Sequence, residues 1–452
     1  MKKILTISLA FLLAFSMLLT GCSNNEENNN TNTVSPTNSA EGTAQPVSID
    51  IFQYKVEIVE PLQEAIDAYT ALHPNVSISL ETVGGGDDIG TALKAKFQSG
   101  TGPVIYNIGG PSDVELYEDK LEDLSDQPWI QYAIEGTLTN ATKDGKVYGL
   151  PYATEGFGLI YNKEIFQDAG VDLSTLTSFE GIEKAFALVQ QKIDSGELKE
   201  KYPLLEAVCE VPGKEAWVWG DHAANLPLGA AFGYDTFKAY EADTVDFGEY
   251  SQGYKEYIDL QIRYSKYKDD PSKSLAVDYA TQVSGGLALE RVACTQQGNW
   301  IYGDLAKIDE SVAQKMAFMP APLKGTAEDS IYILVPMYWC VNSNATDEQK
   351  AVAKDFLNWL YQSDEGKKMI VEDFGFIPPF NNYDGMEPQD PLAQSILQYA
   401  EEGKVLACVF KGFPDGWSTN VMGAKVQGYI GGTLTWEQAL QQAAESWAES
   451  RK

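Results

Sequence analysis

The sequence predicts an α/β fold whose core is a parallel, doubly wound sheet. Strand-like and helix-like patterns alternate along the start of the globular region, as they do in βαβ units. The length of 452 residues is enough for roughly two to three domains with a large buried core. Aromatic residues make up 11% of the chain, which is too many for a disordered polypeptide.

The first five elements follow one another without a long interruption. From the spacing of apolar residues, strands are expected at 47–51, 76–80 and 104–108, and helices at 62–72 and 89–97. Pro74 ends the first helix and Gly100 the second. The order βαβαβ predicts parallel strands, because each helix returns the chain to the same end of the sheet.

Later helices carry recognisable start signals. A Ser or Thr followed three residues later by Glu or Gln forms a capping box, and such sequences open predicted helices at 177–180, 346–349 and 435–438. No repeat of the length typical of solenoid proteins is visible.

The N-terminus has the features of an export signal. Two lysines precede an apolar run over 4–19, which is short for a membrane span and suits a signal-peptide core. The run ends in Leu-Thr-Gly-Cys at 19–22, which resembles the lipobox of bacterial lipoproteins. We therefore expect a signal peptide at 1–21, a lipidated (palmitate-bearing) Cys22 and a flexible tether over 22–46, which is rich in Asn, Ser and Thr. An ordinary secretory signal with a chance cysteine is the alternative.

Composition and missing motifs exclude several functions. With 33 Lys and Arg against 65 Asp and Glu, the formal charge is -32, so no nucleic-acid partner is expected. The chain has only two histidines, His73 and His222, and lacks GxSxG, HExxH and DxDxDG motifs. We expect neither an enzyme nor a bound metal or cofactor. Asp221 precedes His222, but no nucleophile is implied nearby, and His222 is expected in a loop or on the surface.

Three loops follow the predicted parallel strands, at 53–55, 84–88 and 109–113. Ligands of open α/β sheets bind beyond the carboxyl ends of the strands. The candidate ligand-binding residues there are Tyr54, Lys55, Asp87 and Asp113. The glycines at 84–86 are not followed by the GK[ST] of a phosphate-binding loop. We therefore interpret this segment as a loop that lies close to a neutral ligand rather than as a phosphate-binding loop.

Several tryptophans lie outside the predicted helices. Trp217 and Trp219 alternate in a segment expected to be extended, and Trp300 and Trp417 lie in turn-rich sequence. Aromatic faces stack on the CH-rich faces of pyranose rings, while neighbouring polar groups bind the hydroxyls. The polar candidates beside the aromatic and loop residues are Glu155, Asn299 and Asp415. In an exported α/β protein without catalytic motifs, these residues favour saccharide recognition.

The cysteines of the globular region are widely spaced. Cys209, Cys294, Cys340 and Cys408 each lie among apolar neighbours, and none forms a CxxC pair. Two disulfides are conceivable in an exported protein, but buried thiols are the preferred interpretation.

Ordered motifs along 47–452 resemble the extracellular solute-binding proteins of family 1, the sugar-binding lipoproteins of ABC importers related to maltose-binding protein. Residues 144–152 resemble the family's DGKxYGLP hairpin, 158–166 its GLxYNKxxF segment, 288–300 its GxxAMxxxGxW segment, and 376–379 its late GxxP element. Gly416-Trp417 precedes 431–435 much as a sugar-stacking Trp precedes the family's C-terminal motif. Residues 291–294 depart from the usual Lys-Ala-Ala-Met.

The resemblance implies a two-lobed, periplasmic-binding-protein-like fold with a doubly wound sheet in each lobe and the ligand between the lobes. Lobe one would comprise 47–152 plus 320–374, and lobe two 153–319 plus 375–452. Hinge candidates are 150–152, 319–322 and 376–378. Trp300 and Trp417 would stack on sugar. The partners would be a mono- or oligosaccharide and the membrane permease with its cytoplasmic ATPase, and the protein would be a monomer on the extracellular face of the cell membrane.

Two other functions stay open. An anchored carbohydrate-active enzyme would need an acid/base pair, which could hide among the 65 acidic residues. A binding protein for a peptide, polyamine or metal chelate would also fit the acidic composition. Among sugars, the segments at 84–86 and 153–157 resemble family members that bind α-galactosides of the raffinose type.

Overall fold

Two separate sheets organise the part of the chain that the computed structural model describes, residues 45–84, 89–100 and 102–452. The predicted signal peptide, Cys22, the tether as far as residue 44 and Asp87 lie outside these residues. A small hairpin, β4 (Thr142–Lys143) with β5 (Lys146–Val147), forms a further two-stranded sheet. Within the described ranges, no helix is long and apolar enough to cross a membrane.

The first sheet contains the predicted βαβαβ unit. Its strand order is β2 (Val76–Thr82), β1 (Val47–Gln53), β3 (Ile105–Ile108), β12 (Tyr338–Val341) and β6 (Leu150–Pro151). β1 pairs in parallel with β2 and β3 through α1 (Val59–Leu72) and α2 (Ile89–Gln98), which confirms the predicted elements. β12 runs antiparallel to β3 and β6, so the complete sheet is mixed rather than purely parallel.

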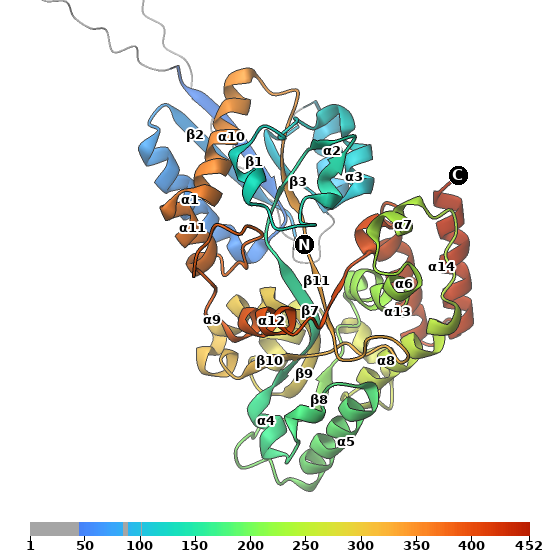
Figure 1. Ribbon diagram of the computed structural model, residues 1–452. Helices are drawn as coiled ribbons and strands as arrows, with labels where there is room; N and C mark the ends of the chain where they lie inside the picture. The colour runs from blue at the N-terminus through green and yellow to red at the C-terminus, as the bar shows by residue number, and fades with distance from the viewer. Residues whose placement is uncertain (1–44, 85–88, 101) are drawn as a thin grey trace, which may run out of the picture. The chain divides into compact units, whose positions relative to one another are not determined.

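Helices cover both faces of the first sheet. Successive side chains of a strand point to opposite faces, so apolar residues on both faces need a covering layer. Ile51 packs on one face with Leu62 of α1 and with α10 (Asp347–Gln362). Phe52, the next residue, packs on the opposite face with Leu93 of α2. Figure 1 shows α1 and α10 on one side of β3 and α2 on the other.

The second sheet is mixed as well. Its strand order is β13 (Val405–Ala407), β11 (Ile331–Leu334), β7 (Glu155–Asn162), β9 (Val292–Gly298) and β8 (Ala207–Glu210), and β10 (Met316–Met319) also pairs with β7. Every residue of β7 is buried, because helices cover both faces. One face packs against α5 (Phe179–Ser195) and α8 (Ser251–Arg263), and the other against α9 (Tyr302–Ala313) and α12 (Pro391–Glu401).

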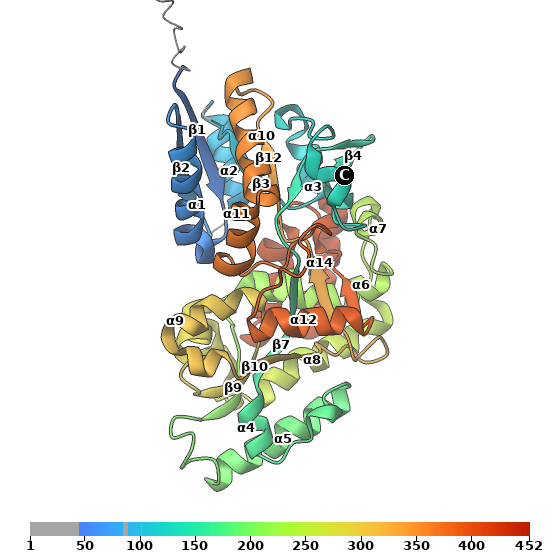
Figure 2. The ribbon, with the colours of Figure 1, turned by 60° about the vertical axis from the view of Figure 1, so that its left-hand side comes forward.

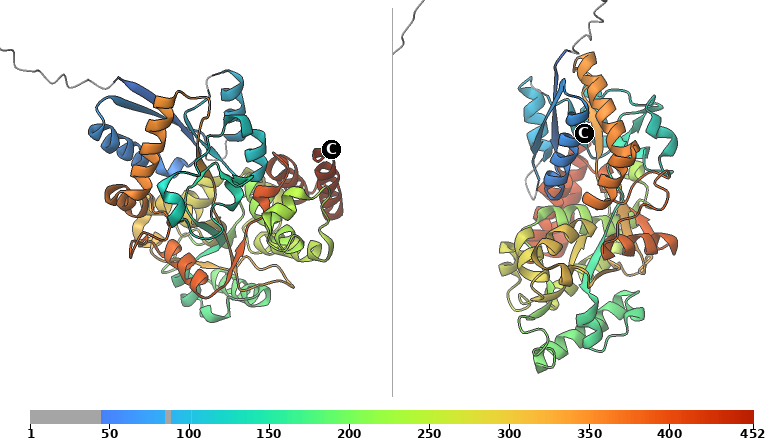
Figure 3. Two further views of the ribbon diagram at one scale, coloured as in Figure 1. Left: turned by 45° about the horizontal axis from the view of Figure 1, so that its top comes forward. Right: turned by 90° about the vertical axis from the view of Figure 1, so that its left-hand side faces the viewer.

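The chain passes between the two sheets three times. It leaves β6 of the first sheet and enters β7 of the second, a path that can be followed in Figures 2 and 3. It returns between β11 and β12, and it passes again before α12, where Ile377 bridges to Thr154. The first and last passages coincide with the hinge candidates at 150–152 and 376–378. Hinge motion at these segments stays a prediction.

The hinge candidate at 319–322 and the lobe boundary at residue 320 are wrong as passages between the sheets. Met319 pairs with Leu159 inside the second sheet. β11 then pairs with β7 and β13, so the chain stays in the second sheet as far as Leu334. The return passage therefore lies at 335–337.

The helix start signals have mixed outcomes. Thr346 with Gln349 and Thr435 with Gln438 form capping boxes, as predicted. At 177–180 the N-cap is Ser178, whose hydroxyl accepts from the backbone N–H of Gly181. The helix therefore begins one residue later than expected, and the predicted box does not form.

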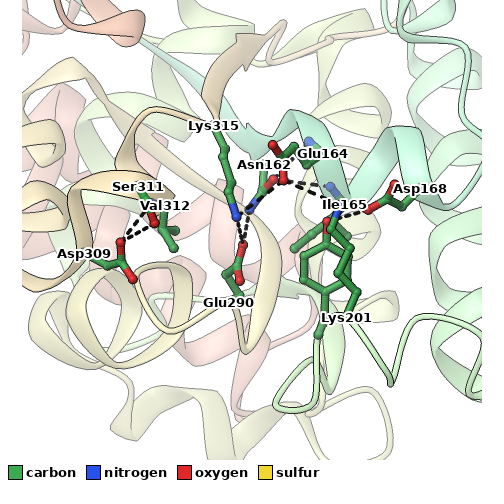
Figure 4. Close-up of polar contacts among 11 residues, drawn as sticks. Asn162, Glu164, Ile165, Asp168, Lys201, Glu290, Asp309, Ser311, Val312 and Lys315 are labelled. Atoms are coloured by element: carbon green, nitrogen blue, oxygen red, sulfur yellow. Dashed lines mark hydrogen bonds and ion pairs between the residues drawn. The ribbon is translucent and has the colours of Figure 1, made fainter.

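Asn162 explains the Asn-Lys pair within the motif at 158–166. Its side-chain oxygen accepts from the backbone N–H groups of Glu164 (3.0 Å) and Ile165 (3.3 Å), which caps α4 (Lys163–Asp168). Its amide nitrogen donates to Glu290 (2.9 Å), which also pairs with Lys315 at 3.0 Å. Figure 4 shows Asn162 and Lys315 pointing toward Glu290. The residue therefore ties β7 to the turn before β9 and to the start of β10.

We expect Asn162→Ala to lower the free energy of unfolding by about 2–3 kcal/mol, because it removes a helix cap and a partly buried hydrogen bond to a charged group. Ser178→Ala is the matched control: it removes the cap of α5 without a bond to a distant carboxylate, and should cost about 1 kcal/mol. Urea unfolding of both variants measures the difference. Equal losses would show that the Glu290 contact contributes nothing.

Candidate functional site

Lys55 forms the centre of a buried charged group between the two sheets. It lies just beyond the carboxyl end of β1, and its side chain is 3% exposed. Its ammonium group pairs with Glu57 at 2.5 Å and with Glu155, the first residue of β7. Burial by itself lowers the pKa of Lys55, but the two carboxylates outweigh it and raise the pKa above its usual value. The ammonium form therefore persists, and the predicted residues Lys55 and Glu155 are in direct contact.

Backbone and side-chain hydrogen bonds hold Lys55 in place. The Gln53 side chain accepts from the Lys55 N–H (2.6 Å) and donates to the Lys55 carbonyl (2.9 Å). The hydroxyl of Tyr152, in a passage between the sheets, donates to the same Gln53 (3.2 Å). Tyr152, which belongs to the hinge candidate at 150–152, thus helps to position Lys55 after β1.

Tyr54 lies beside this group with a free hydroxyl. Its ring is half-buried and packs edge-on against Tyr152, at 5.9 Å between centroids. Its hydroxyl is buried without a hydrogen-bond partner among the described residues. Burial, followed by the charges of Glu155 and Glu57, raises the pKa of Tyr54. The phenol stays protonated, so it can donate a hydrogen bond to a ligand.

Trp217 and Trp300 lie together, with their N–H groups directed into the protein. The ring centroids are 6.3 Å apart, and both side chains are half-buried. The N–H of Trp217 donates to Glu215 (2.8 Å), and that of Trp300 donates to Gln297 (3.0 Å). With the N–H groups occupied, the apolar ring faces are the parts left to contact a ligand.

Gly298 and Asn299 shape the turn that carries Trp300. A Cβ atom on Gly298 would lie 2.0 Å from a ring carbon of Trp300, so only glycine permits this ring position. Asn299, predicted to bind ligand, is 9% exposed and accepts a hydrogen bond from the backbone N–H of Gly156 (3.1 Å). Its side-chain oxygen therefore joins β9 to β7 next to Glu155.

His222 lies beside the two tryptophans and is buried, so its predicted loop or surface position is wrong. Its ring stacks on Phe157 (4.1 Å) and lies 5.2 Å from Trp217 and 5.4 Å from Trp300. Burial, together with the charge of Lys411, lowers the pKa of His222 to about 3. The imidazole is therefore neutral at ordinary pH.

A second charged group contains Asp113, Asp221 and Lys411. Asp113, a predicted site residue, accepts a hydrogen bond from the Gly109 N–H (2.6 Å) after β3. Lys411 follows β13 of the second sheet, and a Cβ atom on Gly109 would lie 3.3 Å from its ammonium nitrogen. Burial lowers the pKa of Lys411, while the charges of Asp221 and Asp113 oppose this effect. Sequence reasoning missed Lys411 and Glu57 because no local motif marks them, and it considered Asp221 only as a neighbour of His222.

Two predicted stacking residues lie in the core instead. Trp219 is fully buried, its N–H donates to the Pro212 carbonyl (3.2 Å), and it lies in a π-helix, Val218–Ala223, rather than in an extended segment. Trp417 is 1% exposed and donates to the Ala443 carbonyl (2.9 Å). Neither indole presents a free face, so their assignment as ligand contacts is not supported.

Asp415 is exposed and pairs with Lys94 of α2. The pair joins the loop after β13 to a helix of the first sheet, away from the two half-buried indoles. Asp415 therefore links the two halves in this structure, and its charge acts on the nearby Asp113.

A cavity of about 900 Å³ also lies beside the passages between the sheets. Its lining includes Thr154, Val335, Ile377 and Lys411. Neither Lys55 nor the half-buried indoles line it. We place the candidate site at Lys55, Glu155, Trp217 and Trp300, because a buried ion pair and two half-buried indoles lie there, joined through the hydrogen bond between Asn299 and Gly156.

Comparison with protein families identifies relatives of the chain. The model of the family described as "Bacterial extracellular solute-binding protein" matches residues 64–394. An arabinooligosaccharide-binding protein of Halalkalibacterium halodurans is 22% identical over 69% of this chain and 62% of its own length. The xylose/arabinose-binding protein XacG of Haloferax volcanii is 22% identical over 73% of this chain and 68% of its own length. The match to the first relative thus spans less than two thirds of that protein.

Solved structures share the fold. A chitin oligosaccharide binding protein superposes with a TM-score of 0.69 at 19% identity, covering 90% of this chain and 99% of its own. The binding protein RafE in complex with raffinose gives a TM-score of 0.69 at 18% identity, covering 90% and 100%. The four proteins named here are described as binding proteins, which agrees with the expectation that the chain is not an enzyme.

The four cysteines of the described region are free and buried, as preferred from the sequence. No disulfide therefore constrains the candidate site.

We expect Lys55→Met to lower the free energy of unfolding by about 3–5 kcal/mol, because it leaves the buried Glu155 and its neighbour Glu57 without a cation. The double variant K55M/E155Q should recover part of the loss. Lys94→Met is the control, since its exposed pair with Asp415 should contribute no more than about 1 kcal/mol. Urea unfolding followed by tryptophan fluorescence measures all three. A Lys55→Met loss no larger than that of the control would contradict this account.

Proposed function

Because the chain belongs to the bacterial extracellular solute-binding protein family, we propose that it is the substrate-binding protein of an ABC importer and captures a sugar between its two lobes. The observation that carries the proposal is the pair of half-buried indoles, Trp217 and Trp300, beside the charged group around Lys55. Both indole N–H groups are bonded within the protein, so apolar ring faces point to the ligand space.

These groups match the chemistry of a saccharide. The CH-rich face of a pyranose packs on an indole ring, and the area removed from water stabilises the complex. The hydroxyls need both acceptors and donors: Glu155 and Glu57 accept, while Lys55 and the free phenol of Tyr54 donate. The neighbouring carboxylates disfavour an anionic solute.

We propose that the ligand is an oligosaccharide, with raffinose-type α-galactosides as the first candidates. Support comes from the resemblance of the segments at 84–86 and 153–157, from one relative described as an arabinooligosaccharide-binding protein, and from a structural neighbour solved with raffinose. A stachyose complex of a Bacillus licheniformis sugar transporter protein shares the fold, with a TM-score of 0.68 at 18% identity over 89% of this chain and 100% of its own.

We further propose that lobe one carries the first sheet and lobe two the second, with the passages at 152–154, 335–337 and 376–378 as hinges. Sugar binds one lobe first, and closure of the other lobe brings the remaining contacts to it. The closed form is then recognised by the permease, whose ATPase drives import. The protein acts as a monomer held to the extracellular face of the membrane through Cys22.

Thermal-shift screening followed by calorimetric titration tests the ligand. The panel contains raffinose, stachyose, arabinotriose, xylotriose and chitotriose, with spermidine and a dipeptide as non-sugars. A sugar at 100 times its Kd raises the free energy of unfolding by about 2.7 kcal/mol. The proposal fails if only the non-sugars raise the melting temperature or if nothing does. Chromatography of the sugars after incubation distinguishes an enzyme, which would release products.

Trp217→Ala and Trp219→Ala form a matched pair for the same titrations. Trp217→Ala should weaken binding of the best sugar by about 30- to 1,000-fold, or about 2–4 kcal/mol, with a nearly unchanged apo melting temperature. Trp219→Ala should instead destabilise the apo protein by about 3–5 kcal/mol, since it empties a core position. If Trp219→Ala weakened sugar binding and Trp217→Ala destabilised the apo protein, the ligand would contact Trp219 and the proposed site would be wrong.

Anchoring through Cys22 has its own test. Cys22→Ala removes the acylated residue, so the variant should appear in the medium or as unprocessed precursor, while the globular region binds sugar as before. Cell fractionation with immunoblotting measures the distribution. Equal membrane association of wild type and variant would contradict the lipoprotein assignment.

A further inference from the structure

We propose that His222 is a specificity-determining ligand contact, whose imidazole hydrogen-bonds a hydroxyl of the sugar held at Trp217 and Trp300. The inference rests on the proposed sugar-binding function and adds a residue that the sequence motifs do not identify.

The first argument is an unsatisfied buried nitrogen. His222 is 5% exposed, and its Nδ1 is buried without a hydrogen-bond partner among the described residues. Buried polar groups in folded proteins almost always have a partner, and leaving one unpaired costs free energy. A nitrogen without a protein partner is therefore a candidate for a bond to a ligand.

The aromatic neighbours of His222 do not supply that partner. Its ring neighbours are Phe157, Trp217, Trp300 and Phe410, at centroid distances of 4.1, 5.2, 5.4 and 6.0 Å. The two phenylalanines carry no polar atoms, and the two indole N–H groups already donate to Glu215 and Gln297. The Nδ1 atom of His222 is thus a polar atom without a bond beside these aromatic rings.

The second argument is position. Trp217 meets the imidazole edge-on, at an interplanar angle of 90°, and Trp300 is tilted by 49°. Because both indoles contact the imidazole, a pyranose stacked on one of them would bring its rim hydroxyls near the unpaired nitrogen of His222.

The protonation state suits this role. Burial and the nearby charge of Lys411 lower the pKa of His222 to about 3. The preceding residue, Asp221, could raise this pKa as a carboxylate, but it does not reverse the shift. A neutral imidazole has one N–H donor and one lone pair, so it can accept from one hydroxyl and donate to another. The orientation of a hydroxyl at this position then decides whether a sugar gains or loses that bond.

The competing explanation is that His222 only fills space against Phe157. NMR distinguishes the two, because the chain contains only two histidines. In the full-length protein labelled with ¹⁵N-histidine, raffinose or stachyose should shift a ring nitrogen of His222. His73, which stacks on Tyr69 at 4.2 Å and has a 39% exposed side chain, should be unchanged and serves as the internal control.

His222→Phe keeps the aromatic stack on Phe157 and removes both nitrogens. We expect it to weaken the binding of raffinose or stachyose about tenfold, as for loss of one hydrogen bond, without lowering the apo melting temperature. His73→Phe should bind like wild type. A raffinose derivative that lacks the contacted hydroxyl should bind wild type and His222→Phe equally well.

The outcomes separate this inference from the function it rests on. If raffinose or stachyose binds wild type but leaves the His222 signals unchanged, and His222→Phe binds equally tightly, His222 is a core residue and the inference is wrong while the proposed function stands. If no sugar of the panel binds wild type, both fail.

Discussion

The ion pairs of Lys55 are the interaction on which the rest of the site depends. A buried ammonium group is costly unless carboxylates surround it, and here one carboxylate comes from each side of a passage between the sheets. Glu57 follows Lys55 on the first sheet's side, while Glu155 begins β7 of the second. Because the Lys55 ammonium pairs with both carboxylates, the end of β1 and the start of β7 must lie together. The hydroxyl of Tyr152 reinforces this requirement through Gln53.

The two indoles of the site are also positioned by hydrogen bonds inside the protein. These bonds occupy the indole N–H groups and leave the ring faces available to a ligand. Glu215 accepts from the Trp217 N–H and also from the backbone N–H of Tyr279 (2.8 Å). Gln297 accepts from Trp300 and donates to Gln282 (2.8 Å). The indole orientations are therefore set by hydrogen bonds within the protein before any ligand arrives. Rings held in this way lose little conformational freedom when a ligand stacks on them.

Local patterns in the sequence could predict much of the fold and part of the site. Apolar spacing predicts β1, β2, β3, α1 and α2 correctly, because each depends on near neighbours. The rule that ligands bind beyond strand ends finds Lys55. The mixed character of the sheets and the place of β11 could not be predicted, because strand pairing joins residues such as Tyr332 and Phe157, far apart in the chain.

Trp217 and Trp219 show how one wrong local assumption misplaces a site residue. In an extended segment, residues two apart lie on the same face, so both indoles would meet the ligand. In the observed helix they point to roughly opposite sides, and Trp219 enters the core while Trp217 stays half-buried. Gly416 has a similar effect on Trp417: its φ of 66° starts a helical turn that directs the indole toward Trp447.

Lys411, Asp221 and His222 illustrate what no single-sequence motif reveals. Lys411 follows an edge strand of the second sheet, yet it lies against Gly109 and Gly110 of the first. Its charge acts on His222 and on Glu155, residues from two other elements. These groups share an environment only because the chain crosses between the sheets three times, which brings distant loops to one place. Binding residues and hinge segments are thus neighbours for the same topological reason, and any change in the angle between the sheets must move Glu155 relative to Lys55.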